Sequence, residues 1–127
     1  MRHLLDTHVL LWYFNDSDEL PDSIAEVMED ALVSKFISVA SLWEFTIKHS
    51  LGKLDFADGV EMFWTMVIAN GITVMQISKE HLNVLERLPL LHRDPFDRLL
   101  LATTIAEAMT ILTSDKNIHQ YDVSWAW

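Results

Sequence analysis

The sequence has 127 residues, of which 50% are hydrophobic, so one domain of this length can bury a core without disulfides or a structural metal. It contains no cysteine, which excludes thiolate metal sites, thiol nucleophiles and disulfide frameworks and favours a reducing, cytoplasmic compartment. Asp6 and His8 interrupt the N-terminal apolar run, which argues against a signal peptide, and no apolar run reaches the ~18 residues of a membrane span. We therefore expect one soluble domain over residues 1–127, with no membrane segment.

The formal net charge of −10 has two interpretations. An acidic surface aids solubility, and it is unlike the basic surface of most nucleic-acid-binding proteins. Alternatively, several carboxylates converge in the fold and bind divalent cations, which invert the local field. Only the positions of the acids can distinguish these two interpretations.

Short apolar runs alternate with longer amphipathic segments, a pattern that predicts an α/β fold with a mainly parallel sheet. In chain order, the first half is expected to contain a strand at 2–5, helices at 7–14 and 22–32, a strand at 35–39 and a helix at 41–52. The second half is expected to contain a helix at 58–71, a strand at 72–78, a helix at 79–89, a helix from about 95, a strand at 110–114 and an edge strand at 123–127. No linker, repeat or low-complexity segment divides the chain.

Four acids fall at the ends of strands or in the first turn of a neighbouring helix: Asp6, Glu44, Asp97 and Asp115. Ligands of open parallel sheets bind outside the carboxyl ends of the strands, so we expect these four side chains to meet at one edge of the sheet. Like charges that lie close together resist simultaneous ionisation unless cations neutralise them. Mg²⁺ and Mn²⁺ prefer carboxylate ligands and suit phosphodiester hydrolysis. The spacing therefore predicts a metal site for phosphodiester chemistry.

Each of these acids also has a purely structural interpretation. Asp6 is placed to cap the following helix, and Ser41 with Glu44 has the spacing of a capping box. Asp97 can complement a helix dipole, and Asp115 can open a turn. The shared location of the four acids is what favours the site.

Three segments resemble PIN-domain proteins, and more narrowly the toxin components called VapC: LLDTHVLLW at 4–12, SVASLWEFTIKHSLGKL at 38–54 and HRDPFDRLLLATTIAEAMTILTSD at 92–115. The resemblance implies a PIN-like three-layer fold, with a parallel sheet flanked by helices, and a metal site at Asp6, Glu44, Asp97 and Asp115. It places Thr113 as a supporting hydroxyl. Asp94 takes an accessory position, although its place before Pro95 is that of a helix N-cap.

The resemblance also implies an enzyme, namely a Mg²⁺- or Mn²⁺-dependent endoribonuclease that forms a homodimer and is neutralised by a cognate antitoxin. The alternative is a catalytically silent PIN-fold module that uses its acidic pocket only to bind a protein or RNA partner. A phosphatase with Asp6 as nucleophile is disfavoured, because the second aspartate of such enzymes would stand at the position of His8.

Basic residues near the acids are the candidate phosphate contacts for RNA. Lys48 follows Glu44 by one helical turn, Arg93 and Arg98 flank the DPFD segment, and Lys116 follows Asp115. Charge pairing with the neighbouring acids is the alternative role for each. Among the six histidines, none shows an i, i+4 metal-binding pair, and only His92 is a candidate neighbour of the site.

Overall fold

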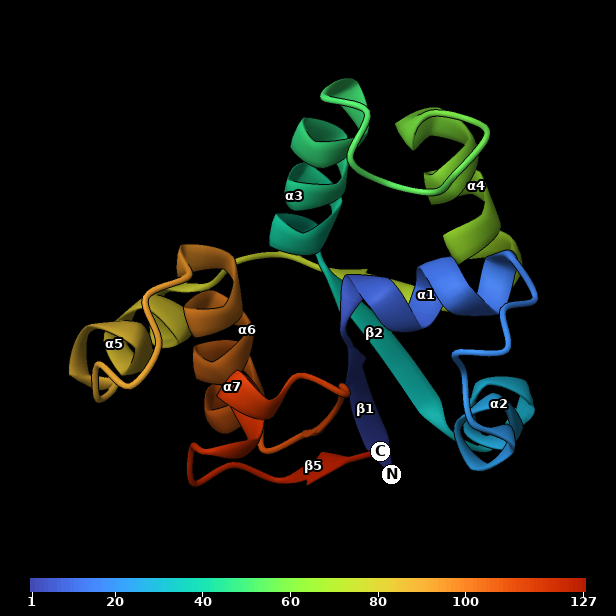
Figure 1. The fold of residues 1–127 in the computed structure, drawn as a ribbon. Coiled ribbons are helices and arrows are strands. Elements are labelled where there is room, and N and C mark those ends of the chain that lie inside the picture. The colour runs from blue at the N-terminus through green and yellow to red at the C-terminus, as the bar shows by residue number, and fades with distance from the viewer.

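A five-stranded parallel sheet in the order β3-β2-β1-β4-β5 forms the middle layer of the fold (Figure 1). The computed structural model describes residues 1–127. The strands are β1 (Arg2–Leu5), β2 (Ser34–Ser38), β3 (Thr73–Met75), β4 (Thr110–Leu112) and β5 (Trp125–Ala126). β1 lies at the centre of the sheet, where Leu4 pairs with Phe36 of β2 and with Ile111 of β4. Because every pair is parallel, the carboxyl ends of the strands lie at one edge.

Helices cover both faces of this sheet. They are α1 (Thr7–Phe14), α2 (Asp22–Glu29), α3 (Val39–Ser50), α4 (Val60–Ala69), α5 (Lys79–Arg87), α6 (Pro95–Ala106) and α7 (Lys116–His119). In Figure 1, α5 and α6 lie on one side of the central strands, and α1, α2 and α4 lie on the other. The predicted three-layer α/β fold with a parallel sheet is confirmed.

The two faces of the sheet belong to separate hydrophobic cores. Leu5 and Leu112 pack with side chains of α1, α2, α3 and α4, whereas Leu4 and Ile111 pack with side chains of α6 and the C-terminal segment. Successive residues of a strand point to opposite faces, so β1 and β4 must be apolar at both positions. This accounts for the short continuous apolar runs in the sequence.

The start of α3 differs from the prediction. The strand was expected to reach Val39 and the helix to begin at Ser41, but α3 already begins at Val39. Its N-cap is Ser38, whose hydroxyl accepts a hydrogen bond from the Ala40 N–H at 3.1 Å. The predicted capping box is therefore wrong, because Ser41 lies inside the helix and its buried hydroxyl has no partner. Glu44 is consequently free of a capping role.

Other boundaries also shift. The predicted strand at 72–78 is reduced to β3, α2 ends at Glu29, and the short helix α7 was not predicted. None of the helices combines the length and the apolar character that a membrane span requires.

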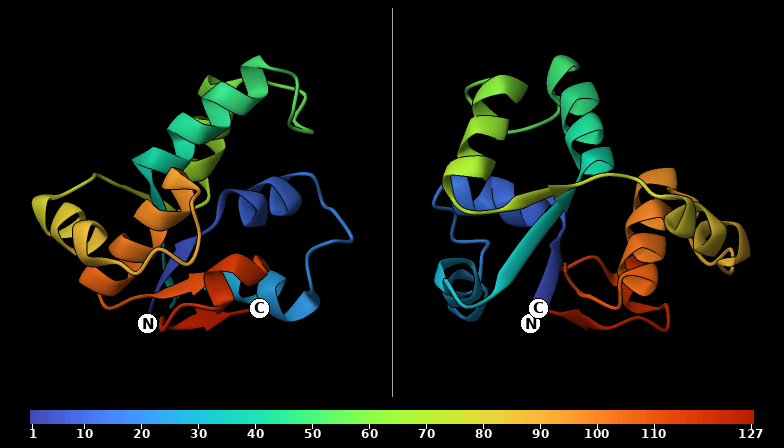
Figure 2. Two further views of the ribbon diagram at one scale, coloured as in Figure 1. Left: turned by 60° about the vertical axis from the view of Figure 1, so that its left-hand side comes forward. Right: turned by 180° about the vertical axis from the view of Figure 1, so that it is seen from behind.

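The first turns of α1, α3 and α6 converge beside the carboxyl ends of the central strands, as the views in Figures 1 and 2 show. Contacts of α3 with both α1 and α6 maintain this arrangement. The topology thus brings three helix starts to one place at the edge of the sheet.

Replacing Ser38 with alanine is expected to lower the free energy of unfolding by about 1 kcal/mol, because the first turn of α3 loses its side-chain acceptor. Replacing Ser41 with alanine is expected to leave that free energy unchanged or slightly raised, because a buried hydroxyl without a partner is removed. Urea unfolding followed by circular dichroism measures both variants. The opposite ranking would contradict the observed start of α3.

Candidate active site

Nine polar side chains, and no hydrophobic one, line a pocket of about 260 Å³ at the convergence of these helix starts. They are Asp6, His8, Glu44, Lys48, His92, Asp94, Asp97, Asp115 and Asn117. All four acids selected from the strand ends are among them, and Asp94 joins them. Residues more than a hundred positions apart in the chain therefore share one pocket.

Asp6 follows β1 and is held by a residue at the end of the neighbouring strand. Its Oδ2 accepts a hydrogen bond of 2.7 Å from the Thr113 hydroxyl, which in turn accepts one of 3.1 Å from the Asp115 N–H. Thr113 is fully buried. Although Asp6 stands at the N-cap position of α1, its side chain makes no capping hydrogen bond. The capping interpretation is therefore excluded for Asp6.

Glu44 projects from α3 and forms an ion pair with Lys48, in which Nζ and Oε2 are 3.0 Å apart. Burial raises the pKa of Glu44, Lys48 opposes that shift, and the charges of Asp6 and Asp94 add to it, so the net shift is upward. Burial lowers the pKa of Lys48, but its hydrogen bond to Glu44 and the nearby carboxylates raise it more. The lysine thus stays charged in the pocket.

Asp94 and Asp97 come from the start of α6. The N-cap interpretation of Asp94 is confirmed, because its Oδ1 accepts hydrogen bonds from the N–H groups of Phe96 and Asp97 at 2.9 and 3.1 Å. Asp97 Oδ2 lies 2.8 Å from His92 Nε2. Side-chain atoms of His92, Asp94 and Asp97 all lie within 4.8 Å of one another, a spacing that can hold a metal ion.

Asp97 is the acid on which the crowding of the pocket acts most strongly. Burial, together with the charges of Asp94, Asp6 and Asp115, raises the pKa of Asp97 to about 7, and the hydrogen bond with His92 opposes this shift. The metal-free pocket therefore favours the protonated form of this carboxyl more than water does.

The carboxylates share one further property. Each of the five uses one oxygen in a hydrogen bond or ion pair with the protein, namely Asp6 Oδ2, Glu44 Oε2, Asp94 Oδ1, Asp97 Oδ2 and Asp115 Oδ1. No protein donor reaches the other oxygen of any of them. Lys48 is the only lysine or arginine among the lining residues. A set of orientated carboxylate oxygens with an uncompensated negative charge fits a hard divalent cation.

Comparison with known proteins supports the assignment of the fold. A model of the PIN domain matches residues 3–124. The chain belongs to the PIN domain family. No relative among curated proteins matches this sequence.

Solved structures with the same fold include VapBC2 from Rickettsia felis bound to a DNA fragment from their promoter. Its TM-score is 0.73 at 16% identity, and the match covers 99% of this chain and 98% of that chain. VapBC-1 from nontypeable Haemophilus influenzae matches with a TM-score of 0.70 at 16% identity, over 99% of this chain and 97% of that chain. A toxin–antitoxin complex from Klebsiella pneumoniae matches with a TM-score of 0.65 at 15% identity, over 98% and 96%. At these identities, the likeness establishes the fold alone.

Two residues that line the acidic pocket described above were not selected from the sequence as site residues. His8 stands in the first turn of α1, two residues after Asp6, and Asn117 stands in α7, two residues after Asp115. Each of them follows a strand-end acid by two residues, and this spacing was the signal in the sequence that could have identified them as pocket residues.

Of the four candidate phosphate contacts, only Lys48 lines the acidic pocket. Arg93 and Lys116 are exposed beside Asp94 and Asp115 but are not part of its wall. The guanidinium of Arg98 instead donates to backbone carbonyl groups of the preceding loop.

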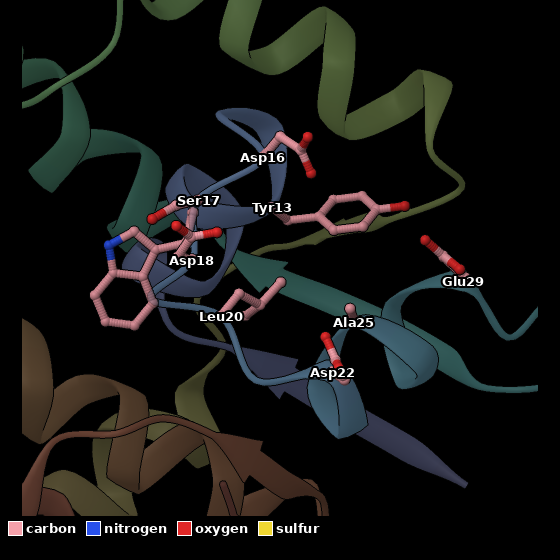
Figure 3. Close-up of a pocket in the computed structure, with 9 residues that line it drawn as sticks. Tyr13, Asp16, Ser17, Asp18, Leu20, Asp22, Ala25 and Glu29 are labelled. Atoms are coloured by element: carbon pink, nitrogen blue, oxygen red, sulfur yellow. The ribbon is translucent and has the colours of Figure 1, made fainter.

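A second acidic hollow lies between the end of α1 and α2, and Figure 3 shows it. Its carboxylates come from Asp16, Asp18, Asp22 and Glu29. In Figure 3 these groups are spread around the rim instead of gathering at one point. No three of them have ligand atoms within 4.8 Å of one another, and the trio that meets this spacing, His92, Asp94 and Asp97, lies in the first pocket. Asp6, Glu44 and Asp115 line that pocket at wider spacing.

Replacing Asp97 with asparagine is expected to stabilise the metal-free protein at pH 8. A carboxyl whose pKa is about 7 in the folded state and 3.8 as a reference binds more protons when folded, so the wild type loses stability as the pH rises through that interval. The variant has no such group. We expect its advantage in unfolding free energy to grow by roughly 2 kcal/mol between pH 5 and pH 8. Thermal unfolding in EDTA checks this, and an advantage that does not depend on pH would contradict the raised pKa.

Proposed function

We propose that this chain is a metal-dependent endoribonuclease that uses Mg²⁺ or Mn²⁺, and that it is the toxin of a toxin–antitoxin pair. The observation that carries the proposal is the set of five carboxylates that line one pocket, each with one oxygen free of protein donors. Asp6, Asp97 and Asp115 would hold the metal directly or through water, and Glu44 would complete the site. Membership in the PIN domain family supports the same chemistry.

A divalent ion bound in this pocket would supply an activated water and would neutralise charge at the phosphate. The protein's own contribution is to orientate the ligands. The Thr113 hydroxyl holds one oxygen of Asp6, and the His92 imidazole holds one oxygen of Asp97. Asp94 and Asp115 are held by the N–H groups that they cap. Pre-orientated ligands of this kind need no rearrangement when the ion and substrate arrive.

Lys48 is the residue best placed to receive the RNA backbone. One of its three N–H groups is used by Glu44, and its side chain is 39% exposed, which leaves donors for a phosphate oxygen. Arg93 and Lys116 are proposed as outer phosphate contacts, because they are exposed next to pocket acids. Such contacts position RNA without reading its sequence.

An antitoxin partner and a homodimer are also part of the proposal. The structural neighbours are toxin–antitoxin complexes. In addition, large apolar side chains on and beside α3 and α4 are exposed, namely Trp43 of α3 and Leu51 directly after it at 62% each, and Ile68 of α4 at 57%. Large apolar side chains that are exposed in the single chain are available for protein–protein contacts.

Cleavage of structured RNA by the purified chain is expected to require Mg²⁺ or Mn²⁺ and to stop in EDTA. Asp6→Asn is expected to lower the cleavage rate by at least about 100-fold, since outer-shell partners of metal ligands alone contribute about 10–100-fold. Asp97→Asn is expected to have a similar effect while leaving the fold intact.

The matched control is Asp18→Asn, which makes the same chemical change in the hollow of Figure 3. It should cleave at the unaltered rate. Cleavage by Asp97→Asn at the wild-type rate would remove that residue from the ligand set, and metal-independent cleavage would overturn the mechanism. If the intact pocket only binds RNA and never cleaves it, the chain is an interaction module.

Production of the chain in a bacterial host without an antitoxin is expected to slow growth, because the proposed activity depletes cellular RNA. Asp6→Asn at an equal soluble level should restore growth. Growth curves with immunoblotting of soluble protein measure this. Normal growth at high soluble yield would count against the toxin role but not against the nuclease activity.

A further inference from the structure

The loop that joins α5 to α6 carries His92 and Asp94 to the pocket, although it has no regular secondary structure. Side chains from two other elements bind its backbone. One is Tyr121, which follows α7, and the other is Arg98 of α6. Hydrogen bonds thus hold the loop against α6, which carries Asp97, and against the C-terminal segment, residues 116–127.

The Tyr121 hydroxyl makes three hydrogen bonds to this loop, and the Arg98 guanidinium lies 3.4 Å from it as a further donor. The hydroxyl accepts from the N–H groups of Leu91 and His92 at 3.0 and 2.8 Å, and it donates to the Pro89 carbonyl at 2.9 Å. The residue is only 5% exposed and packs in the core that contains Leu100 and Ile118. The position of the hydroxyl is therefore set by packing.

Arg98 binds the beginning of the same loop. Its Nη1 donates to the Pro89 carbonyl at 3.0 Å, and its Nη2 donates to the Leu88 carbonyl at 3.2 Å. Arg98 directly follows Asp97 in α6. One turn of helix therefore carries both the acid and the group that holds the loop opposite it.

His92 links the held loop to the acid. Its backbone N–H binds Tyr121, and its Nε2 lies 2.8 Å from Asp97 Oδ2, while no protein donor reaches Asp97 Oδ1. With Asp97 ionised, the imidazole N–H donates to Oδ2 and leaves Oδ1 free. Any change in the position of the loop would change the orientation of this carboxylate.

We propose that Tyr121 and Arg98 are positioning residues of the metal site, which hold loop residues 88–92 so that His92 orientates the Asp97 carboxylate. This inference rests on the metal-dependent function proposed above. It gives Arg98 a role inside the protein and not at the RNA backbone. It also makes the C-terminal segment part of the site through a residue that does not line the pocket.

The test is the affinity of the purified full chain for Mn²⁺ alone, measured by isothermal titration calorimetry without RNA. Tyr121→Phe is expected to weaken Mn²⁺ binding about 10-fold, as is common for outer-shell partners. Tyr13→Phe is the matched control, because it removes the hydroxyl of the other tyrosine, which makes no hydrogen bond and lies outside the pocket. Unchanged Mn²⁺ affinity in folded Tyr121→Phe would overturn the proposal.

Variants of His92 separate positioning from a loss of fold. His92→Gln keeps an N–H donor near the place of Nε2 and should retain most of the Mn²⁺ affinity, whereas His92→Ala should lose about 10-fold. Adding Tyr121→Phe to His92→Ala should cause little further loss, because Tyr121 acts through His92. Fully multiplicative losses, or equal losses in His92→Gln and His92→Ala, would overturn the proposal.

The failure of the proposed function is distinguishable from the failure of this inference. Mn²⁺ binding that depends on Tyr121 in a chain that cleaves no RNA would overturn the nuclease and leave the positioning role intact. RNA cleavage by the unaltered chain, with normal Mn²⁺ affinity in Tyr121→Phe, would overturn the positioning role and leave the nuclease function intact. Absence of Mn²⁺ binding in the unaltered chain would overturn both.

Discussion

Like-charge repulsion in a small pocket is the constraint on which the rest of this molecule depends. Five carboxylates and one lysine line about 260 Å³ at the edge of the sheet. Each carboxylate is held by a protein donor through one oxygen, and burial, with a smaller contribution from the neighbouring negative charges, raises the pKa of both Glu44 and Asp97. Without a cation, the repulsion among these carboxylates lowers the stability of the folded state. Favourable interactions elsewhere in the fold must compensate for this loss.

The two hydrophobic cores supply that stability and also the geometry. They pack on opposite faces of the central strands, and Leu4 and Leu5 of β1 each belong to a different one. A strand that is held from both sides delivers Asp6 to a fixed place, and the paired strand β4 does the same for Thr113 and Asp115. The positions of these side chains in the pocket are therefore a consequence of the packing of the two cores beneath it.

The C-terminal segment contributes more to the pocket than its short elements suggest. His119 Nε2 lies 2.7 Å from the Thr113 carbonyl, and its ring stacks on Trp125 with centroids 3.5 Å apart. Tyr121 holds the loop that carries His92. Groups that do not line the pocket thus orientate Asp6 and Asp97, as outer-shell residues would do around the proposed metal ligands.

Local patterns in the sequence were sufficient for the parallel α/β fold and for the meeting of Asp6, Glu44, Asp97 and Asp115, because apolar runs define strands and parallel strands end at one edge. They were not sufficient for the start of α3, where Ser38 and Ser41 are equally suited to cap a helix and only packing against the sheet decides. The bonds from Tyr121 to the loop around His92, and from Arg98 to the same loop, were likewise decided only by tertiary structure. They join residues about 10 to 30 positions apart whose backbone partners carry no signature in the sequence, since any residue can offer an N–H or a carbonyl.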